Sequence, residues 1–188
     1  MIKLTDSEII ESIKRGNQSD YSILVDRYKN KAYSLLKRML KNNMEAEEVL
    51  QDSFLKAFQA LSNFKGEAKF STWFYRIVYN TALTRLSTKK RKIEMEMSSI
   101  DDYEFLKSGF DIHSNEKEDT AKMVNELINR LPEKNAAVVS MFYLDEMRCE
   151  EISNVMNLNV TNIKVLLYRS RNILRDMIVQ NNLVEELR

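Results

Sequence analysis

Apolar residues recur every three or four positions along most of this chain, which is the spacing of helices that bury one face. The recurring residues between positions 21 and 41 are Tyr21, Leu24, Tyr28, Ala32, Leu35 and Met39. The same pattern predicts helices at residues 45–61 and 71–87, with Ser71 as a cap for the second of them. Thr5 and Glu8 have capping-box spacing and Gly16 can end a helix, so a short helix is expected first.

The regular pattern is lost between residues 88 and 114 and then returns. It predicts helices at residues 121–131, 132–144 and 150–156, with Pro132 as the first residue of the second. A turn at residues 157–159 and a long helix from residue 160 complete the chain. A short helix, a three-residue turn and a longer helix have the spacing of a helix-turn-helix. We therefore expect an N-terminal domain at residues 1–90, a linker at residues 91–117 and a C-terminal helix-turn-helix domain at residues 118–188.

The composition narrows the fold class. The 188 residues include only three Gly and one Pro, whereas turn-rich β-sandwiches and barrels need both at their corners. A glycine-rich phosphate loop is excluded for the same reason. The sequence therefore predicts an all-α fold, with two small helical domains joined by a flexible acidic linker.

The net charge is +1, but the charges are unevenly distributed. Residues 85–92 contain five cations and no acid, and residues 160–175 contain four cations and no acid. Between them, residues 101–119 hold seven acids against two lysines. This pattern indicates two positive surfaces and an acidic connector.

The last helix separates into an apolar arc and a basic stripe when about 100° is allowed for each residue. Lys164, Tyr168, Arg171 and Arg175 lie on the stripe, opposite the arc that contains Leu166. A helix of this kind can place its first residues against base edges in a major groove and its later cations on phosphates. A solvated amphipathic helix would show the same pattern, so this helix alone leaves both interpretations open.

The helix at residues 71–87 has two distinct faces. Trp73, Phe74, Ile77, Val78 and Thr81 form the expected buried arc, and Tyr75, Arg76, Tyr79 and Asn80 form the other. Aromatic side chains beside cations on an exposed face suit stacking with single-stranded bases. The alternative is that the two tyrosines pack against a neighbouring helix.

The helix at residues 45–61 begins with a group of acids and a glutamine. These acids suit the positive end of the helix dipole, and that explanation requires no partner. They also form part of a motif, Glu45-Ala-Glu-Glu-Val-Leu-Gln-Asp-Ser-Phe54, whose resemblance to a family gives them a second interpretation.

This motif resembles the polymerase-binding helix of bacterial sigma factors, specifically of the small extracytoplasmic-function (ECF) type. Phe70-Ser-Thr-Trp-Phe-Tyr-Arg-Ile-Val-Tyr-Asn80 is similar to the promoter-melting helix of that group. Leu131-Pro132, Glu151-Ile152 and residues 160–171 resemble its C-terminal helix-turn-helix. The three motifs occur in the family's order and spacing and cover most of residues 20–178, so the chain is identified as a member of this family.

The resemblance implies a function and a set of site residues. A sigma factor binds core RNA polymerase, directs promoter recognition and melts the DNA at initiation, here for a stress or envelope regulon. The expected polymerase contacts are Glu48, Gln51 and Asp52. The expected contacts to the minus-ten element are Phe64, Lys65, Gly66, Lys69, Trp73, Arg76, Tyr79, Asn80 and Arg85. The expected contacts to the minus-thirty-five element are Thr161, Asn162, Lys164, Val165, Tyr168, Arg169 and Arg171.

The resemblance also implies partners. Core polymerase, duplex promoter DNA and the single-stranded non-template strand are expected, together with an anti-sigma factor that is membrane-anchored in many relatives. Four positions depart from the family pattern. Cys149 and Ser153 stand where the family usually has a capping hydroxyl and an alanine, Asn157 replaces a common glycine, and Leu166 replaces a frequent arginine. Asparagine can adopt the left-handed turn, and Leu166 belongs to the apolar arc rather than to the DNA-binding stripe.

Two other functions are weaker alternatives. A free-standing helix-turn-helix regulator would bind duplex DNA as a dimer, but it leaves the acidic and the aromatic helices unexplained. An enzyme is not expected, because His113 is the only histidine and lies apart from Cys149 in the sequence. No catalytic residue, metal site or cofactor is therefore predicted.

The N-terminal residues and the single cysteine indicate the cellular compartment of the protein. The first residues contain acid and hydroxyl groups rather than the apolar core of a signal peptide. The longest uncharged apolar stretch, residues 136–144, is too short to cross a bilayer. One cysteine excludes an intrachain disulfide and suits a reducing compartment. We expect a cytoplasmic protein with no membrane insertion of its own.

Overall fold

The computed structural model describes residues 4–97 and 118–181, and every regular element in these two ranges is helical. The N-terminal helices are α1 (Asp6–Lys14), α2 (Tyr21–Leu40), α3 (Asn43–Ala60) and α4 (Phe70–Met97), with short 3-10 turns η1 (Gln18–Asp20) and η2 (Leu61–Asn63). The C-terminal helices are α5 (Glu118–Arg130), α6 (Glu133–Val139), α7 (Cys149–Met156) and α8 (Val160–Gln180). A π-helical turn, η3 (Ser140–Leu144), extends α6. The predicted all-α class is confirmed.

Local signals in the sequence set most of the helix ends. The capping box of Thr5 and Glu8 is present at the start of α1, and Asn42 accepts a hydrogen bond from the Glu45 amide at the start of α3. Asn157 ends α7 in the left-handed conformation, with φ of 53°. This confirms that asparagine replaces the usual glycine there without losing the turn.

Helix α4 is longer than predicted. It continues to Met97, so the predicted end of this helix at residue 87 is wrong, and residues 91–97 of the predicted linker are helical. Lysine, arginine, glutamate and methionine make up six of the seven residues of this segment, and they have high helix propensity. The prediction ended the helix early because the apolar period does not continue through this segment. The remainder of the predicted flexible linker, residues 98–117, lies outside the described residues.

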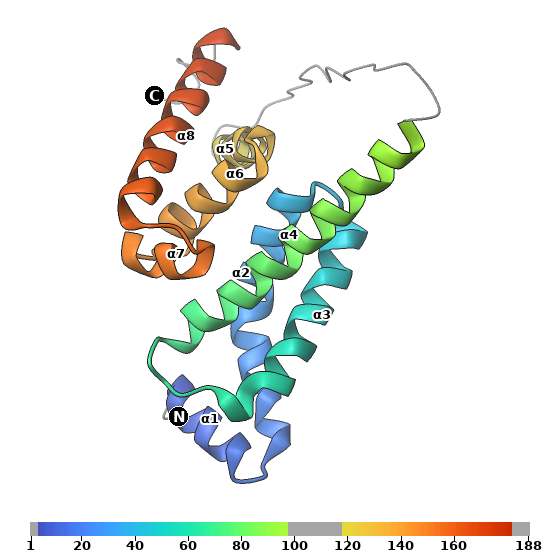
Figure 1. Cartoon of the computed structure of the whole chain (residues 1–188). Helices are drawn as coiled ribbons and strands as arrows, with labels where there is room; N and C mark the ends of the chain where they lie inside the picture. The colour runs from blue at the N-terminus through green and yellow to red at the C-terminus, as the bar shows by residue number, and fades with distance from the viewer. Residues whose placement is uncertain (1–3, 98–117, 182–188) are drawn as a thin grey trace.

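Helices α2, α3 and α4 pack together in the N-terminal domain (Figure 1). An aromatic cluster lies between them. Phe74 of α4 is fully buried. Its ring centroid lies 4.6 Å from that of Phe54 and 5.9 Å from those of Phe70 and Tyr28. The short helix α1 is attached through Asp6, which accepts hydrogen bonds from the side chains of Arg27 and Tyr28 on α2.

The C-terminal domain places α6 and α7 against α8. Ile152 of α7 and Ile163 of α8 are fully buried, and Ser170 of α8 accepts a hydrogen bond from the side chain of Asn135 on α6, at 2.9 Å. Helix α5 packs on the far end of α8 through Met123 and Leu127. The turn between α7 and α8 therefore joins two helices of one core, as a helix-turn-helix requires.

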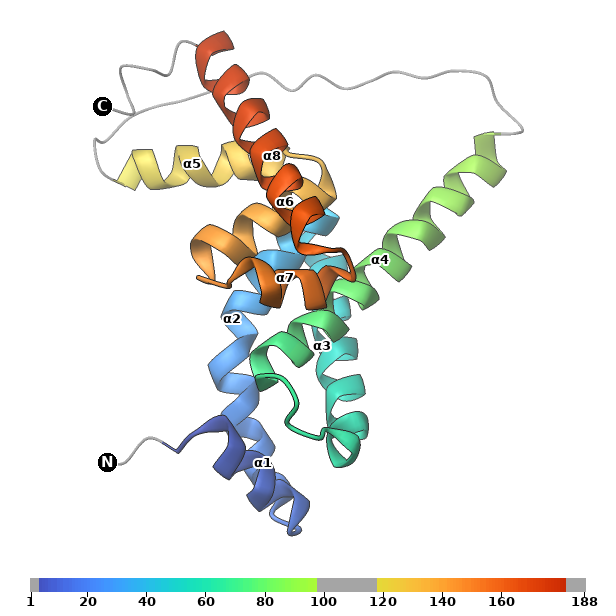
Figure 2. The same cartoon turned by 60° about the vertical axis from the view of Figure 1, so that its left-hand side comes forward.

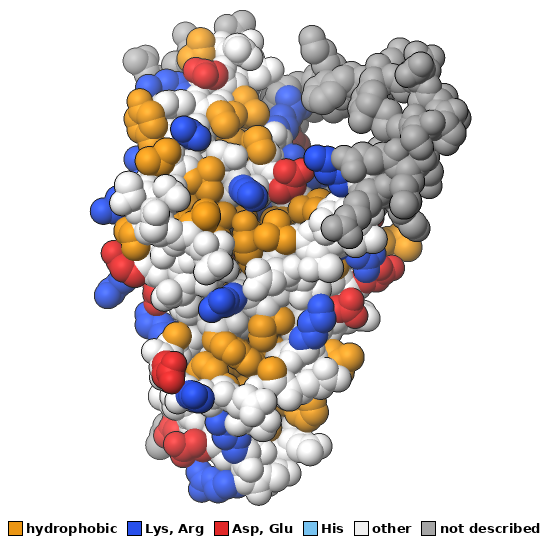
Figure 3. Space-filling view, in the orientation of Figure 1, with side chains coloured by type: hydrophobic (Ala, Val, Ile, Leu, Met, Phe, Trp, Pro, Cys, Tyr) orange, Lys and Arg blue, Asp and Glu red, His pale blue; other side chains and the backbone are white. Residues whose placement is uncertain are grey.

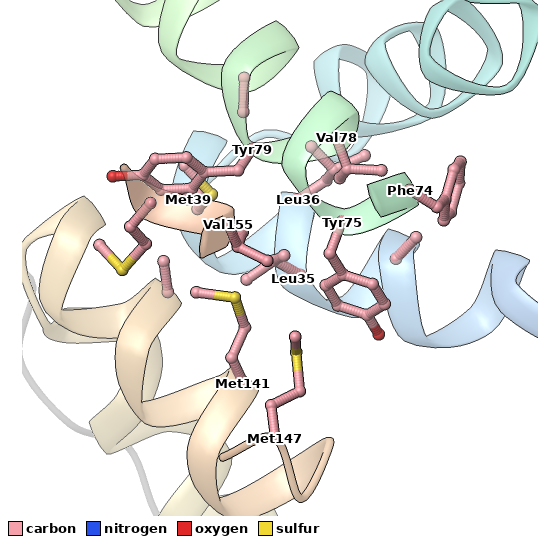
Figure 4. Packing of buried hydrophobic residues seen from close by; sticks show 14 of the residues in the cluster. Leu35, Leu36, Met39, Phe74, Tyr75, Val78, Tyr79, Met141, Met147 and Val155 are labelled. Carbon is pink, nitrogen blue, oxygen red and sulfur yellow. The ribbon is translucent and has the colours of Figure 1, made fainter. Parts of the chain in front are cut away.

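The two domains pack directly against each other. Helix α4 packs along α7 and α2 packs along α6, and Figure 2 shows α7 crossing in front of α2 and α4. A single hydrophobic core includes buried residues of both domains. Figure 4 shows Met39, Tyr79 and Val155, from α2, α4 and α7, in one cluster. The sequence predicted two domains but did not predict this contact.

Phe74→Ala is expected to destabilise the protein by about 3–5 kcal/mol, because it leaves a cavity among the aromatic rings that surround it. Urea unfolding followed by circular dichroism measures this loss. Val179→Ala, on an exposed position of α8, should change the free energy of unfolding by less than about 0.5 kcal/mol. Equal effects of the two substitutions would contradict the placement of Phe74.

Candidate nucleic-acid interface

Helix α8 presents the basic stripe that the sequence predicted. Asn159 caps the helix by accepting a hydrogen bond from the Asn162 amide at 2.7 Å, and Ile163, Leu167 and Ser170 anchor its buried side. The predicted minus-thirty-five contacts are all exposed: Thr161, Asn162, Lys164, Val165, Tyr168, Arg169 and Arg171. Leu166 is half-buried and packs against the core, as its position on the apolar arc predicted.

Tyr143 is a contact residue of this surface that sequence reasoning missed. Its hydroxyl accepts a hydrogen bond from Arg171 Nε at 2.7 Å, and the Arg171 guanidinium carbon lies 5.9 Å from the centre of its ring. Tyr143 is itself exposed at the end of η3. Its separation of 28 residues from Arg171 explains why no pattern along the chain paired them.

The loop before α4 is held by aromatic packing. The Phe64 ring lies 5.1 Å from the Trp73 ring and 6.0 Å from the Phe70 ring, between centroids. Lys14 of α1 donates a hydrogen bond to the Phe64 carbonyl at 2.6 Å. Gly66 adopts a left-handed φ of 75°, a conformation that costs glycine little. The structure therefore brings Phe64 and Trp73 together and leaves Lys65, Gly66 and Lys69 exposed beside them.

The predicted exposed face of α4 is only partly exposed. Arg76 and Asn80 face solvent, but Tyr75 and Tyr79 are each only 2% exposed. The expectation that both tyrosines lie on an open face is therefore wrong, and the packing alternative is correct for this arrangement. The helix that covers them is α7 of the other domain, so the burial results from a contact that helical periodicity within α4 cannot reveal.

Lys69 is also engaged with the C-terminal domain. Its ammonium group lies 2.8 Å from the Glu151 carboxylate of α7. Glu151 also accepts a hydrogen bond from the Arg148 amide, at 2.9 Å, at the start of the same helix. These contacts favour the charged carboxylate and outweigh burial, so the pKa of Glu151 is lowered.

The acidic surface of α3 combines predicted and missed residues. Glu48, Gln51 and Asp52 are exposed, as predicted. The apolar side chains of Met44 and Leu55 are exposed on the same helix, 73% and 57% respectively. One face of the helix carries positions 44, 48, 51, 52 and 55. Because only the polar residues on this face were considered in the sequence, the two apolar ones were missed. An exposed apolar pair among acids is typical of a surface that binds another protein.

This acidic surface is linked to the basic end of α4. Arg85 donates a hydrogen bond to Glu48 at 2.9 Å, and Lys89 lies 3.3 Å from Glu45. Arg85, which the sequence assigned to DNA, is therefore half-buried against the helix assigned to polymerase. Glu48 and Arg85 belong to one ion pair, whereas Gln51 and Asp52 lie farther along the exposed face.

Asp145 is a buried carboxylate between the domains, and no pattern in the sequence singles it out. It borders a small pocket shared with Tyr28, Lys31 and Tyr75. Burial raises the pKa of Asp145, while Tyr75, Lys31 and Arg38 act in the opposite direction. Burial, and then the charge of Asp145, raises the pKa of Tyr75. This pocket is an interdomain polar site, and its lining includes the Lys69–Glu151 pair.

Other site types receive no support from the described residues. No cluster of candidate metal ligands occurs within residues 4–97 and 118–181. Cys149 is a free, half-buried thiol at the start of α7, and His113 lies outside the described residues. None of the helices in the described ranges is both long and apolar enough to span a membrane.

Cations lie along the face that carries α4 and α8 without merging into one patch (Figure 3). Apolar side chains are visible between them. This distribution differs from the continuous basic surface that supports strong non-specific DNA binding.

Two protein-family models match this chain, one in each helical domain. The model for Sigma-70 region 2 matches residues 24–92, and the model for Sigma-70, region 4 matches residues 121–174. The first match contains α3 and most of α4, and the second contains α7 and most of α8. The alternative of a free-standing dimeric regulator is not favoured, because it does not account for the first match.

Individual relatives and solved structures extend over nearly the whole chain. The chain is 30% identical to the ECF RNA polymerase sigma-E factor of Haemophilus influenzae, over 94% of this chain and 96% of the relative. It is 32% identical to the ECF RNA polymerase sigma factor SigW of Bacillus subtilis, over 88% and 92% of the two chains.

CnrH, solved in complex with the cytosolic domain of CnrY, has a similar fold, with a TM-score of 0.67 at 19% identity over 93% of this chain and 97% of that chain. RpoE from Bartonella quintana, solved with the anti-sigma factor NepR, has a TM-score of 0.66 at 14% identity over 85% and 96%. Two family models in the correct order and relatives of matching length show that this chain belongs to the ECF sigma factors of bacterial RNA polymerase.

Proposed function

We propose that this sigma factor divides its work between three surfaces: α3 binds core polymerase, α4 with its preceding loop binds the melted minus-ten element, and α8 reads the minus-thirty-five element. One observation carries the proposal. A single chain combines an exposed basic recognition helix with an aromatic loop pocket and an acidic, partly apolar helix face. A duplex-binding regulator would need only the first of these.

The minus-thirty-five surface suits major-groove binding. Thr161, Asn162 and Lys164 lie in the first turns of α8, where their side chains reach base edges. Val165 and Tyr168 add apolar area suited to thymine methyl groups. Arg169 and Arg171 follow farther along the helix, in position to pair with phosphates.

The minus-ten surface suits a base removed from the stack. Unstacking and unpairing cost a few kcal/mol per base. Stacking on an aromatic side chain contributes about 1–3 kcal/mol per base and offsets that cost. The Phe64–Trp73 pair offers such a surface, and Lys65, Lys69, Arg76 and Asn80 surround it with donors for the backbone and the base.

Sigma factors are transcription initiation factors rather than enzymes, and we assign no catalytic step to this chain. It adds promoter contacts to a polymerase, and the polymerase catalyses RNA synthesis. We therefore place this protein in the cytoplasm with that enzyme. An anti-sigma factor is a proposed partner by analogy with RpoE of Bartonella quintana, which was solved with NepR.

Run-off transcription tests the function as a whole. Purified core polymerase is combined with this protein and a pool of fragments from the source genome. We expect specific transcripts that appear only when the protein is added, and these transcripts also identify its promoter. An absence of new transcripts, with tight duplex binding by the protein alone, would favour the dimeric regulator instead.

Asp52→Arg should weaken core-polymerase binding about fivefold to tenfold, because it reverses a charge on the α3 face while leaving both residues of the Glu48–Arg85 pair in the chain. Biolayer interferometry with immobilised core polymerase measures the change. Glu126→Arg makes the same charge reversal on an exposed position of α5 and should leave the affinity within about twofold. Unchanged affinity for Asp52→Arg would remove α3 from the interface.

Tyr143→Phe should weaken holoenzyme binding to the identified promoter about fivefold, because Arg171 loses the hydroxyl that orients it (roughly 1 kcal/mol). Arg171→Ala should have a larger effect. The double variant should bind no more weakly than Arg171→Ala alone, since Tyr143 acts through the arginine. Additive losses in a gel-shift titration would contradict this positioning role.

A further inference from the structure

The loop that leads into α4 is fixed at its first residue by a side chain from α1. Lys14 lies in the last turn of α1, and its ammonium group donates a hydrogen bond to the Phe64 carbonyl at 2.6 Å. The Phe64 amide donates to the Leu61 carbonyl at 3.1 Å. Both main-chain polar groups of Phe64 are therefore engaged, one by η2 and the other by a residue 50 positions earlier in the sequence.

Helix α1 is itself held firmly in the N-terminal domain. The core contains three buried isoleucines of this helix, Ile9, Ile10 and Ile13. Asp6 accepts a hydrogen bond from the Tyr28 hydroxyl, and the centroid of the Tyr28 ring lies 5.4 Å from that of Phe70, the first residue of α4. Helix α1 also packs against η2, and Figure 1 shows it beside the loop that leads into α4. Lys14 therefore extends to the loop from a fixed base.

The loop residues that follow Phe64 are open to solvent. Residues 65–68 are all exposed, and Gly66 adopts a left-handed φ of 75°. A Cβ at Gly66 would meet no atom within 4 Å, so there is free space around the tip of the loop. Exposed loops are mobile unless their ends are tied down. The conformation of this tip therefore depends on how Phe64 at one end and α4 at the other are held.

We propose that Lys14 is a positioning residue of the minus-ten site, because its hydrogen bond to the Phe64 carbonyl holds the loop in the conformation that receives an unstacked base. This inference rests on the proposed function, since it takes its meaning from base capture beside Phe64 and Trp73. A loop that is ordered before binding loses less conformational freedom when the base arrives, which favours capture. Helix α1 is then part of the minus-ten site, although no α1 residue is among the predicted contacts.

The partner of Lys14 distinguishes this role from that of a phosphate contact. A lysine that pairs with phosphate adds about one unit to the slope of binding affinity against salt concentration on logarithmic scales. A lysine that holds a carbonyl oxygen within the protein leaves this slope unchanged. Lys14→Met should therefore slow base capture and leave the salt dependence of promoter binding by the holoenzyme as it is. A reduced salt slope would make Lys14 a phosphate contact and overturn the positioning role.

The fluorescence of Trp73 tests whether Lys14 holds the loop in the free chain. Trp73 is the single tryptophan of the sequence, and its ring centroid lies 5.1 Å from that of Phe64. Lys14→Met removes the ammonium group and keeps an unbranched side chain at an exposed position. We expect acrylamide to quench the fluorescence about twofold more strongly in this variant, because the Phe64 ring leaves Trp73 more often. Equal quenching in Lys14→Met and the unaltered protein would overturn the proposal.

Two matched variants control for charge and for the hydrogen bond. Lys14→Arg keeps a cation that can donate to the carbonyl, and it should restore the quenching of the unaltered protein. Arg15→Met removes a cation from the next position of the chain, where the side chain pairs with Glu11 at 3.4 Å and is largely exposed. It should leave Trp73 unchanged. An equal effect of Arg15→Met would show a general response to charge and overturn the proposal.

Promoter opening tests whether the held loop favours base capture. Potassium permanganate reacts with thymines that have left the stack, so its reactivity over time follows opening by the holoenzyme at the promoter identified by run-off transcription. Lys14→Met should slow opening about fivefold, because a charge-assisted hydrogen bond is lost. Lys14→Arg and Arg15→Met should stay within about twofold of the unaltered protein, a range typical of surface substitutions. Affinity for core polymerase should not change in any of them.

The outcomes separate this inference from the proposed function. Opening at the normal rate by Lys14→Met, in a holoenzyme that gives promoter-specific transcripts, would overturn the positioning role and leave the proposed function intact. An equal loss of core-polymerase affinity and of opening would assign Lys14 a general structural role and overturn the positioning role as well. An absence of promoter-specific transcripts with the unaltered protein would overturn the proposed function and, with it, the assignment of Lys14 to base capture, even where Trp73 shows that Lys14 holds the loop.

Discussion

The packing of α4 between two partners is the constraint on which the rest of the structure depends. One side of the helix enters the aromatic cluster of the N-terminal domain through Phe74, and another lies along α7 of the C-terminal domain. Little of its first half is left for solvent, and Arg76 and Asn80 occupy that remaining strip. The helix assigned to strand separation is thus also the element that joins the two domains.

Charged side chains are paired at two contacts, the one between α4 and α3 and the one between the two domains. The basic end of α4 meets the acids of α3 through Arg85 and Lys89, and the N-terminal cations at the domain interface meet acceptors of the C-terminal domain. The net charge of +1 reflects nearly equal numbers of cations and acids, 29 Lys and Arg against 28 Asp and Glu, and some of them are paired in this way. A chain that neutralises its own cations has few left for non-specific DNA, so affinity for a promoter depends on an additional binding event such as association with polymerase.

Much of the fold and the site could be predicted from local patterns. The apolar period and the capping residues gave the helices, and the exposed stripe of α8 was correct at each predicted position. The extension of α4 to Met97 was missed because the apolar period of the sequence does not continue through it. Tyr143 and Asp145 were missed because their partners, Arg171 for one and Lys31 for the other, lie far away in the sequence.

The sequence by itself determined which segments are helical, apart from the end of α4, together with the all-α class and the family, because these depend on interactions within a few residues and on motifs in a fixed order. Only the tertiary structure decided which faces of those helices meet solvent. Tyr75 and Tyr79 have the spacing of an exposed stripe within α4, and they are buried because α7 arrives from more than 60 positions away. Helical periodicity indicates whether one face of a helix is apolar or polar. The long-range packing of the domains determines whether another element covers that face.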